Sequence, residues 1–256
     1  MFDGNIVGTI DAAELALALF FLFFAALVFW LRREDRREGY PLEDDVTGAV
    51  QSEGGPFHTA PIKTFKLPFG KGSVTSPPGD RDPFEIAAKR MDPYAGSPSV
   101  PTGNPLKDGI GPAAYAQRAD YPDQYADGAL RIVPMKSDDH YSVATFSFSR
   151  DPIGMEVTGA DGKKAGKVVD LWVDRAESIA RYLEIKVKGG NILAPIAMAV
   201  IHKDSVEIDA INASDFAGAP KLASKGQVTR LEEDKICGYF GGGYLYANEA
   251  RQEPII

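Results

Sequence analysis

An uncharged apolar segment close to the N-terminus constrains this chain more than any other feature. Residues 15–31 read LALALFFLFFAALVFWL, and Ala12, Ala13 and Glu14 directly precede them. Together they give about 20 residues, the length at which a helix crosses the roughly 30 Å hydrocarbon core of a bilayer. The run is apolar on every face, whereas a surface helix of a soluble protein keeps a polar face. The sequence therefore predicts a single transmembrane helix over residues 12–31.

The charges on either side of this run predict its orientation. Arg32, Arg33, Arg36 and Arg37 follow it, whereas no Lys or Arg precedes it. Because positive flanks stay in the cytoplasm, residues 1–11 are expected outside and the rest of the chain inside. The same arginines are expected to contact anionic lipid head groups. A cleaved signal peptide is the alternative, but it needs a basic start, a shorter apolar core and a small-residue cleavage site.

The rest of the chain is polar and acidic. The whole chain has 36 Asp and Glu residues against 28 Lys and Arg residues, which gives a formal net charge of −8. Nucleic-acid binding needs a basic surface, so no nucleic-acid partner is expected. Cys237 is the one cysteine, which excludes an internal disulfide and a cysteine metal site. The sequence has no P-loop, GxGxxG, HExxH or GxSxG motif, so we expect no enzyme and no metal site.

Residues 32–141 are expected to form an extended segment. Pro and Gly recur from residue 43 to 110, too often for long helices or central strands. A flexible tether is the alternative, but the aromatic and aliphatic residues dispersed along the segment favour packing on a partner. One short piece, residues 63–68, has the pattern of an edge strand.

Residues 142–256 are expected to form a folded domain. Residues 167–174 and 182–188 alternate between apolar and polar side chains, so each is expected to be a strand with one apolar face. The side chains expected to face the core are Val169, Leu171, Val173, Leu183, Ile185 and Val187. Residues 205–210 alternate in the same way. Several short strands at this spacing predict a small antiparallel barrel or sandwich.

A C-terminal helix is expected after these strands. Thr229 and Glu232 have the spacing of a capping box, in which each side chain bonds the other's backbone N–H. The helix is expected to run towards Tyr239 and to end at the glycines of residues 241–243. Glu232 and Glu233 then fall in its first turn, where negative charge is favourable.

Charged residues gather around the predicted turn between the first two strands. They are Asp170, Asp174, Glu177 and Arg181. Carboxylates held close together titrate as a group and could relay protons. An ordinary solvated turn that carries charge is the alternative, and the residues by themselves favour it.

Several long blocks of this sequence resemble one protein family. They are LRREDRREGYPLE at 31–43, PIKTFKLP at 61–68, PTGNPLKDGIGPAAY at 101–115, IVPM at 132–135, AGKVVDLWVDRAESIARYLEIKV at 165–187 and EEDKICGYFGGGYLYA at 232–247. In these blocks the chain is similar to the H subunit of the purple-bacterial photosynthetic reaction centre. The resemblance covers nearly the whole chain and is more specific than any single motif above.

The resemblance implies a fold, a role and a setting. It implies one membrane helix and a cytoplasmic PRC-type antiparallel β-barrel with a C-terminal helix. Such a subunit is not an enzyme: it caps the L and M subunits, shields their quinone sites and helps to bring protons to the secondary quinone. It binds no cofactor alone, while the complex carries bacteriochlorophyll, bacteriopheophytin, quinones and non-haem iron. The setting is the inner (intracytoplasmic) membrane, with a periplasmic N-terminus, membrane lipids and light-harvesting antenna proteins.

The resemblance also assigns roles to particular residues. Asp174, Glu177 and Arg181 match family positions near the secondary quinone pocket, and Asp170 lies on the same hairpin. Glu177 is the expected carrier of the proton.

The resemblance further implies interface residues and a point of proton uptake. Glu232 or Glu233 matches an acidic interface position, and Tyr40 lies in a matching block. Some relatives take up protons at surface histidines just before the segment that matches IVPM, but this chain has none at residues 127–131. Asp127 is then the expected uptake carboxylate, and His140 is a poorly aligned substitute.

A membrane-anchored PRC-barrel adaptor that binds a protein or RNA partner is the alternative function. PRC barrels also occur outside photosynthesis. An adaptor built on the barrel alone has no need of REGYPLE at 37–43 or PTGNPLKDGIGP at 101–112. These blocks outside the barrel therefore favour the reaction-centre subunit.

Overall fold

The computed structural model describes most of the chain. The described residues are 5–7, 10–40, 42–44, 46–49, 60–76, 85–145 and 150–252. The chain divides into two compact units. The helical unit comprises Met1–Phe84 and Asp92–Ser97, and the sheet unit comprises Glu85–Met91 and Pro98–Ile256. The division into four segments that the sequence suggests remains a prediction.

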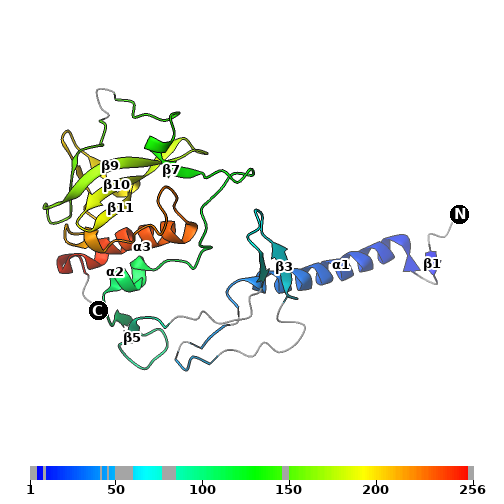
Figure 1. Ribbon diagram of the computed structural model, residues 1–256. Coiled ribbons are helices and arrows are strands. Elements are labelled where there is room, and N and C mark those ends of the chain that lie inside the picture. The colour runs from blue at the N-terminus through cyan, green and yellow to red at the C-terminus, as the bar shows by residue number, and fades with distance from the viewer. Residues whose placement is uncertain are drawn as a thin grey trace. The chain divides into compact units, whose positions relative to one another are not determined.

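The helical unit is built on α1, which runs from Ala12 to Glu34 (Figure 1). A capping box sets its start: the Glu14 N–H donates to Asp11 Oδ1 at 2.8 Å, and the Asp11 N–H donates to Glu14 Oε2 at 3.4 Å. None of the side chains of α1 is buried within the chain. The helix is long and apolar enough to span a membrane, which agrees with the predicted anchor.

Short elements flank α1. β1 (Asn5–Val7) pairs with β2 (Ile10–Asp11) before it, and the 3-10 turn η1 (Asp35–Arg37) follows it. Later in the unit, β3 (Lys63–Lys66) pairs antiparallel with β4 (Ser73–Ser76). The short strand expected in the Pro/Gly-rich segment is thus confirmed as β3.

The sheet unit contains a seven-stranded sheet in its described residues. Its strands are β7 (Ile132–Pro134), β8 (Glu156–Thr158), β9 (Lys164–Asp174), β10 (Ile179–Val187), β11 (Gly190–Pro195), β12 (Val200–Ile201) and β13 (Ser205–Glu207). The hydrogen-bonded order is β11-β10-β9-β8-β13-β12, and β7 pairs with the last residues of β9. All of these ladders are antiparallel except β8 with β13. No ladder between described strands joins β11 to β12, so the path has two ends, within the mainly-β architecture that was expected.

Small elements complete the sheet unit. They are β5 (Ala88–Arg90) paired with β6 (Ser99–Pro101), α2 (Pro105–Asp108), η2 (Gly111–Ala113), η3 (Met135–Ser137), η4 (Ile196–Met198), η5 (Asp215–Gly218) and η6 (Glu249–Arg251). Among them, α2 and η2 lie against the C-terminal helix α3 (Arg230–Tyr246). Residues 101–113 therefore take part in the packing of the folded unit, although they lie in the segment that was expected to be extended.

The expected alternation of buried and exposed side chains holds in β10 but not throughout β9. In β10 the expected side chains Leu183, Ile185 and Val187 are buried. In β9 the register slips between Glu184↔Asp170 and Ile185↔Val168, so the residue between, Val169, forms a bulge. Val168 is buried in its place, and the inward position predicted for Val169 is wrong.

The second half of β9 is buried on both faces. Leu171 and Val173 are buried as expected, but so are Asp170, Trp172 and Asp174. Both faces of this part of the strand are therefore covered by the rest of the unit, so it hides polar as well as apolar side chains. The two carboxylates of β9 are therefore not the solvated charges that an exposed face would carry.

The helix α3 begins where the capping box predicts. The Glu232 N–H donates to Thr229 Oγ1 at 3.1 Å, and the Thr229 N–H donates to Glu232 Oε2 at 2.8 Å. The predicted end at residues 241–243 is wrong, because the helix continues to Tyr246.

Close packing explains why glycines occur inside α3. A Cβ added at Gly238 would lie 2.8 Å from Ala113 O, and one at Gly242 would lie 2.8 Å from Ala113 Cα. One added at Gly243 would lie 3.0 Å from the carbonyl carbon of Ala210. These glycines let α3 approach η2 and the turn after β13 more closely than any other residue allows.

The core lies between α3 and the sheet. Phe240 and Ile236 of α3 and Phe216 of η5 are fully buried, together with Leu183 and Ile185 of β10. The rings of Phe216 and Phe240 meet edge to face at 5.9 Å between centroids. This packing brings the first turn of α3 next to β10 and close to the turn between β9 and β10 (Figure 1).

Candidate functional site

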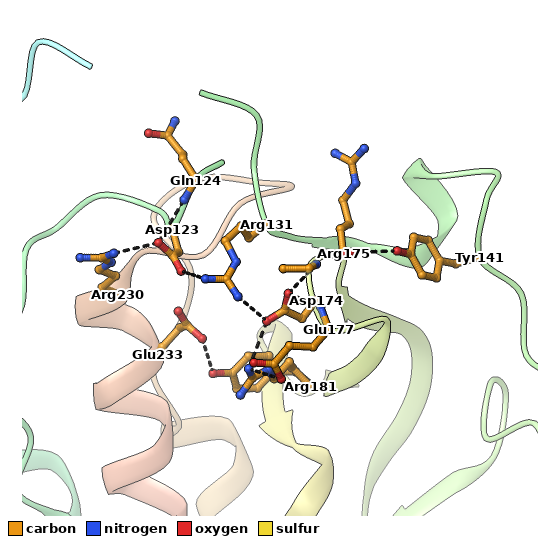
Figure 2. Close-up of polar contacts among 12 residues, drawn as sticks. Asp123, Gln124, Arg131, Tyr141, Asp174, Arg175, Glu177, Arg181, Arg230 and Glu233 are labelled. Carbon is orange, nitrogen blue, oxygen red and sulfur yellow. Dashed lines mark hydrogen bonds and ion pairs between the residues drawn. The ribbon is translucent and has the colours of Figure 1, made fainter. Parts of the chain in front are cut away.

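A buried carboxylate at the end of β9 organises the charged residues of the sheet unit (Figure 2). Asp174 Oδ1 accepts from the backbone N–H of Ala176 at 2.9 Å and of Glu177 at 3.3 Å. Its Oδ2 accepts from Arg181 Nη2 at 3.1 Å and lies 3.5 Å from Arg131 Nη2. A carboxylate offers about four acceptor positions. Donors of the chain itself therefore occupy essentially all those of Asp174.

Arg181 joins Asp174 to Glu177 across the turn between β9 and β10. The Nη2 atom that binds Asp174 also donates to Glu177 Oε2 at 2.9 Å. Burial lowers the pKa of Arg181, but the hydrogen bond to Asp174 and the charge of Glu177 outweigh it, so the pKa is raised. The side chain of Glu177 is 51% exposed. We call these three residues the Asp174 cluster, and Glu177 is the member that faces solvent.

Ion pairs extend from the Asp174 cluster towards α3. Arg131 Nη1 donates to Asp123 Oδ2 at 2.8 Å, and Arg230 Nη2 donates to Asp123 Oδ1 at 2.8 Å. Burial raises the pKa of Asp123, but Arg230 and Arg131 outweigh it and leave the pKa lowered. The ladder between β7 and β9 sets Ile132 opposite Asp174, which brings the neighbouring Arg131 to the cluster.

Glu233 approaches the Asp174 cluster from the first turn of α3 (Figure 2). The Tyr182 hydroxyl donates to Glu233 Oε2 at 2.8 Å. Burial raises the pKa of Glu233, and neither the bond from Tyr182 nor the charge of Arg181 cancels that effect. Because a raised pKa brings a carboxyl group closer to titrating near neutral pH, Glu233 is a second candidate proton carrier.

A surface hollow of about 440 Å³ borders the β9–β10 turn, since Arg175 of this turn is among its lining residues. Asp127, Asp138, His140 and Arg175 are among its lining residues. Asp138 lies 2.8 Å from His140 Nδ1 and 3.0 Å from Arg175 Nε. The hydrogen bonds with His140 have the largest effect on the pKa of Asp138, and together with the charge of Arg175 they lower it. The two alternatives for proton uptake, Asp127 and His140, therefore line one hollow. Arg175 of this hollow is two residues from Glu177.

Two predicted acidic residues lie apart from the cluster. Asp170 is four residues before Asp174 on β9, about 13 Å away at the rise of an extended strand. Its Oδ1 accepts from the next backbone N–H at 2.9 Å. Glu232 is buried, and it accepts from the Ala223 N–H at 2.6 Å and the Thr229 N–H at 2.8 Å. The geometry gives Glu232 a capping role and turns Glu233 towards the cluster.

The predicted lipid residues and one predicted interface residue, Tyr40, lie in the helical unit. They are Arg32, Arg33, Arg36, Arg37 and Tyr40, within and just after the last turn of α1. The Arg36 guanidinium lies 5.3 Å from the centroid of the Tyr40 ring, a cation–π contact. Arg37 turns back along the chain and donates to Glu34 at 2.8 Å.

The sequence did not point to Asp123, Arg131 or Arg230. Asp123 lies in an irregular segment that reaches α3 through the bridge between Pro122 and Thr229. Only the position of Arg131 next to the block at 132–135 could have drawn attention to it. These residues become part of the site through contacts between distant segments.

The arrangement is suited to holding and exchanging protons. It combines an exposed carboxylate, Glu177, a buried and fully engaged one, Asp174, and a carboxyl group with a raised pKa, Glu233. The charge of Arg181 lies between the first two. No three His, Cys, Asp or Glu side chains in the described part of the chain are grouped so that they could hold a metal ion.

Comparison with known families assigns both parts of the chain. Residues 4–137 match the family model of the photosynthetic reaction centre H-chain N-terminal region. Residues 144–214 match the PRC-barrel domain, in agreement with the sheet unit described above. The first match alone covers more than half of the chain. This chain therefore belongs to the photosynthetic reaction centre H-chain family.

Proposed function

We propose that this chain is the accessory subunit that covers the L and M subunits, shields their quinone sites and assists proton delivery to the secondary quinone. Membership of the H-chain family implies the association with L and M. The observation that carries the proton-delivery part is the Asp174 cluster, in which an exposed Glu177 is held beside a buried carboxylate. Two-electron reduction of a quinone takes up two protons, so a buried quinone needs protonatable groups that lead to it.

The contacts divide the roles within the cluster. Asp174 is engaged by two backbone N–H groups and two arginines, so proton uptake there would disrupt the turn. Glu177 has one side-chain partner, Arg181, and stays half exposed. We assign proton transfer to Glu177 and anchoring to Asp174 and Arg181. Asp170, which lies about 13 Å away, is assigned an electrostatic role only.

The raised pKa of Glu233 supports it as a second carrier. Proton uptake is assigned to the hollow lined by Asp127 and His140, since Arg175 of this hollow belongs to the turn that also holds Glu177. Glu232 and Tyr40 are proposed as subunit contacts, which rests on the family resemblance.

The proposed setting follows from α1. The arginine-rich end is placed in the cytoplasm, residues 1–11 in the periplasm and 12–31 in the inner membrane. The pigments, quinones and non-haem iron are proposed to belong to the complex, with antenna proteins and lipids around it. The adaptor alternative has less support, because the match at residues 4–137 lies outside the barrel.

The first experiment asks whether the chain belongs to a pigmented complex. The tagged chain, purified in mild detergent from its own host, is expected to bring bacteriochlorophyll bands that bleach reversibly after a flash. A colourless preparation from pigmented cells would contradict the proposal and favour the adaptor.

The second experiment tests Glu177 in that complex. We expect Glu177→Gln to slow proton-coupled reduction of the secondary quinone by about tenfold, ~1.4 kcal/mol in barrier, while primary charge separation is unchanged. The matched control is Glu207→Gln, because Glu207 is 47% exposed and its Oε2 also lies against a side-chain nitrogen, His202 Nε2, at 3.0 Å. Unchanged rates of the second electron transfer in Glu177→Gln would rule out this role.

A further inference from the structure

The β3–β4 hairpin carries a concentrated positive charge close to the end of the membrane helix in sequence. Residues 60–76 contain Lys63, Lys66 and Lys71 and no acidic residue. The chain as a whole has a net charge of −8, so this composition departs from its surroundings. A local excess of lysine attracts negatively charged partners.

Hydrogen bonds fasten this hairpin to the end of α1. Arg37 Nη1 donates to Pro61 O at 2.8 Å and to Ser76 O at 2.6 Å, and Ser76 Oγ donates to Arg37 O at 3.3 Å. Lys63 Nζ forms an ion pair with Glu34 Oε2 at 2.9 Å. Both strands of the hairpin are thus tied to the residues that directly follow the apolar run.

These bonds set the depth of the hairpin relative to a bilayer. The apolar run ends at Leu31, and Arg37 lies six residues further along α1 and η1, about 9 Å at 1.5 Å per residue. The polar zone on each side of a bilayer is about 5–8 Å thick. Arg37 therefore lies at the outer edge of the head-group zone when α1 spans the membrane. Glu34, which pairs with Lys63, is three residues past Leu31 and lies inside that zone, about 4.5 Å from its inner edge.

The hairpin has one apolar and one polar face. Phe65 pairs directly with Val74, and Lys63 with Ser76, so these four side chains lie on one face. Thr64, Lys66, Ser73 and Thr75 lie on the other. Phe65 and Val74 are each 48% exposed. Because Lys63 and Ser76 contact Glu34 and Arg37, the apolar face is the one turned to the membrane helix.

Exposed apolar residues continue beyond the paired strands. Ile62 precedes β3, and Phe69 lies in the turn with the Lys71 ammonium 5.0 Å from its ring centroid. Lysine stems can cover apolar surface while the charged ends reach head groups. Aromatic rings and lysines on one small element are typical of segments that lie in a membrane interface.

We propose that the β3–β4 hairpin is a second membrane contact of this chain, which binds anionic phospholipid. Its apolar face, with Phe65 and Val74, enters the boundary between head groups and acyl chains. Lys71 in the turn binds lipid phosphates, and Lys66 reaches them from the polar face with its long side chain. The inference rests on the proposed placement of α1 in the membrane. It extends the lipid contact beyond the four arginines that follow the apolar run.

Spin labels in the reconstituted complex test the proposal. One label is attached at Phe65→Cys in a Cys237→Ser background, and the complex is placed in vesicles that contain phosphatidylglycerol. The matched control is Thr64→Cys on the opposite face, and Leu22→Cys in α1 serves as the reference for a lipid-embedded site. Collision of each label with oxygen and with a water-soluble nickel chelate is measured by power-saturation EPR.

The three labels separate the possible outcomes. We expect a higher oxygen-to-nickel ratio at position 65 than at 64, and the highest ratio at 22. Low collision with both reagents at 65 would show that protein covers this face, and equal nickel access at 64 and 65 would show water. Either result overturns the proposal, whereas a water-like Leu22→Cys label would contradict the membrane placement of α1 itself.

A second measurement tests whether the lysine charges of the hairpin attract anionic lipid. Lys66→Gln and Lys71→Gln are each expected to weaken enrichment of phosphatidylglycerol around the complex by about fivefold. Lys203→Gln, in the turn between β12 and β13 of the sheet unit, is the control and should change nothing. Equal enrichment in all three variants would remove the anionic-lipid part of the proposal.

Discussion

Large apolar side chains have opposite surroundings in the two units. In the sheet unit, Phe216 and Phe240 are fully buried between α3 and the sheet. In the helical unit, Leu22 and Phe23 of α1 are 70% and 61% exposed. The sheet unit hides its apolar surface within its own fold, whereas α1 has to be covered by something other than this chain.

The two units also treat charge differently. In the sheet unit, Asp174 and Asp123 are held by arginines from separate segments, so their positions depend on the whole fold. In the helical unit, Glu34 is held by Arg37 one turn away and by Lys63 of β3, so the charges join two segments side by side. The comparison teaches that charges of the sheet unit gather around a buried carboxylate, Asp174, whereas those of the helical unit fasten a hairpin to the end of α1.

Removing the helical unit tests this division most severely. A chain that starts at Glu85 is expected to lose association with pure lipid vesicles, because it lacks both α1 and the β3–β4 hairpin. It should still unfold cooperatively, since the buried core of the sheet unit lies entirely within it. Membrane sedimentation and near-ultraviolet circular dichroism measure the two properties. A truncated chain without a cooperative transition would show that the sheet unit depends on the rest.

Disturbing the packing of α3 should have the next largest effect. Gly242→Ala places a Cβ against the backbone of Ala113, and we expect a loss of about 3 kcal/mol in the free energy of unfolding. Gly241→Ala is the matched control, because its Cβ meets only Pro112 O at 3.7 Å. It should be neutral or stabilising by up to about 1 kcal/mol through helix propensity. Urea unfolding in detergent measures both, and equal effects would refute the packing argument.

Asp123→Asn should weaken the charged site of the sheet unit by about 2 kcal/mol at pH 7. Because the pKa of Asp123 is lowered by its arginines, its contribution is present above the ordinary value of 3.8 and is lost as the pH falls further. The difference between the variant and the native chain should therefore shrink on acidification. Thermal unfolding across a pH series measures this. A constant difference at all pH values would contradict the ion-pair account.

Glu233→Gln should have the smallest effect, of opposite sign. The pKa of Glu233 is raised above its ordinary 4.5, so the folded state binds the proton more tightly and loses stability as the pH rises through this region. Gln has no proton to lose and can still accept from Tyr182. We expect the variant to be about 1 kcal/mol more stable at pH 8 and equal to the native chain below pH 4. A destabilised variant at pH 8 would show that the charged form is the favoured one.

Local patterns predicted the parts that depend on neighbouring residues. The apolar run predicted α1, and the period of two predicted the buried face of β10. The capping box of Thr229 and Glu232 predicted the start of α3. Asp174, Glu177 and Arg181 meet as expected, because one hairpin turn brings them together.

The errors arose where a distant segment decides the outcome. Val169 is displaced by a bulge that exists only in the pairing of β9 with β10. Gly242 and Gly243 continue the helix because Ala113 and Ala210 approach it closely. The separation of Asp170 from Asp174 is a different case, because four residues of one extended strand set it and no distant segment is involved.

The sequence by itself determined the long apolar helix, the mainly-β domain and the charged turn, since hydrophobic length, residue period and turn chemistry act over a few neighbouring residues. Only the tertiary structure decided that Asp123, Arg131 and Arg230 join this turn, because they come from the loop at 123–131 and from α3, which meet through packing. It also turned Glu233 rather than Glu232 to the site. Burial and ion pairing depend on what surrounds a side chain, and that is set by the whole fold.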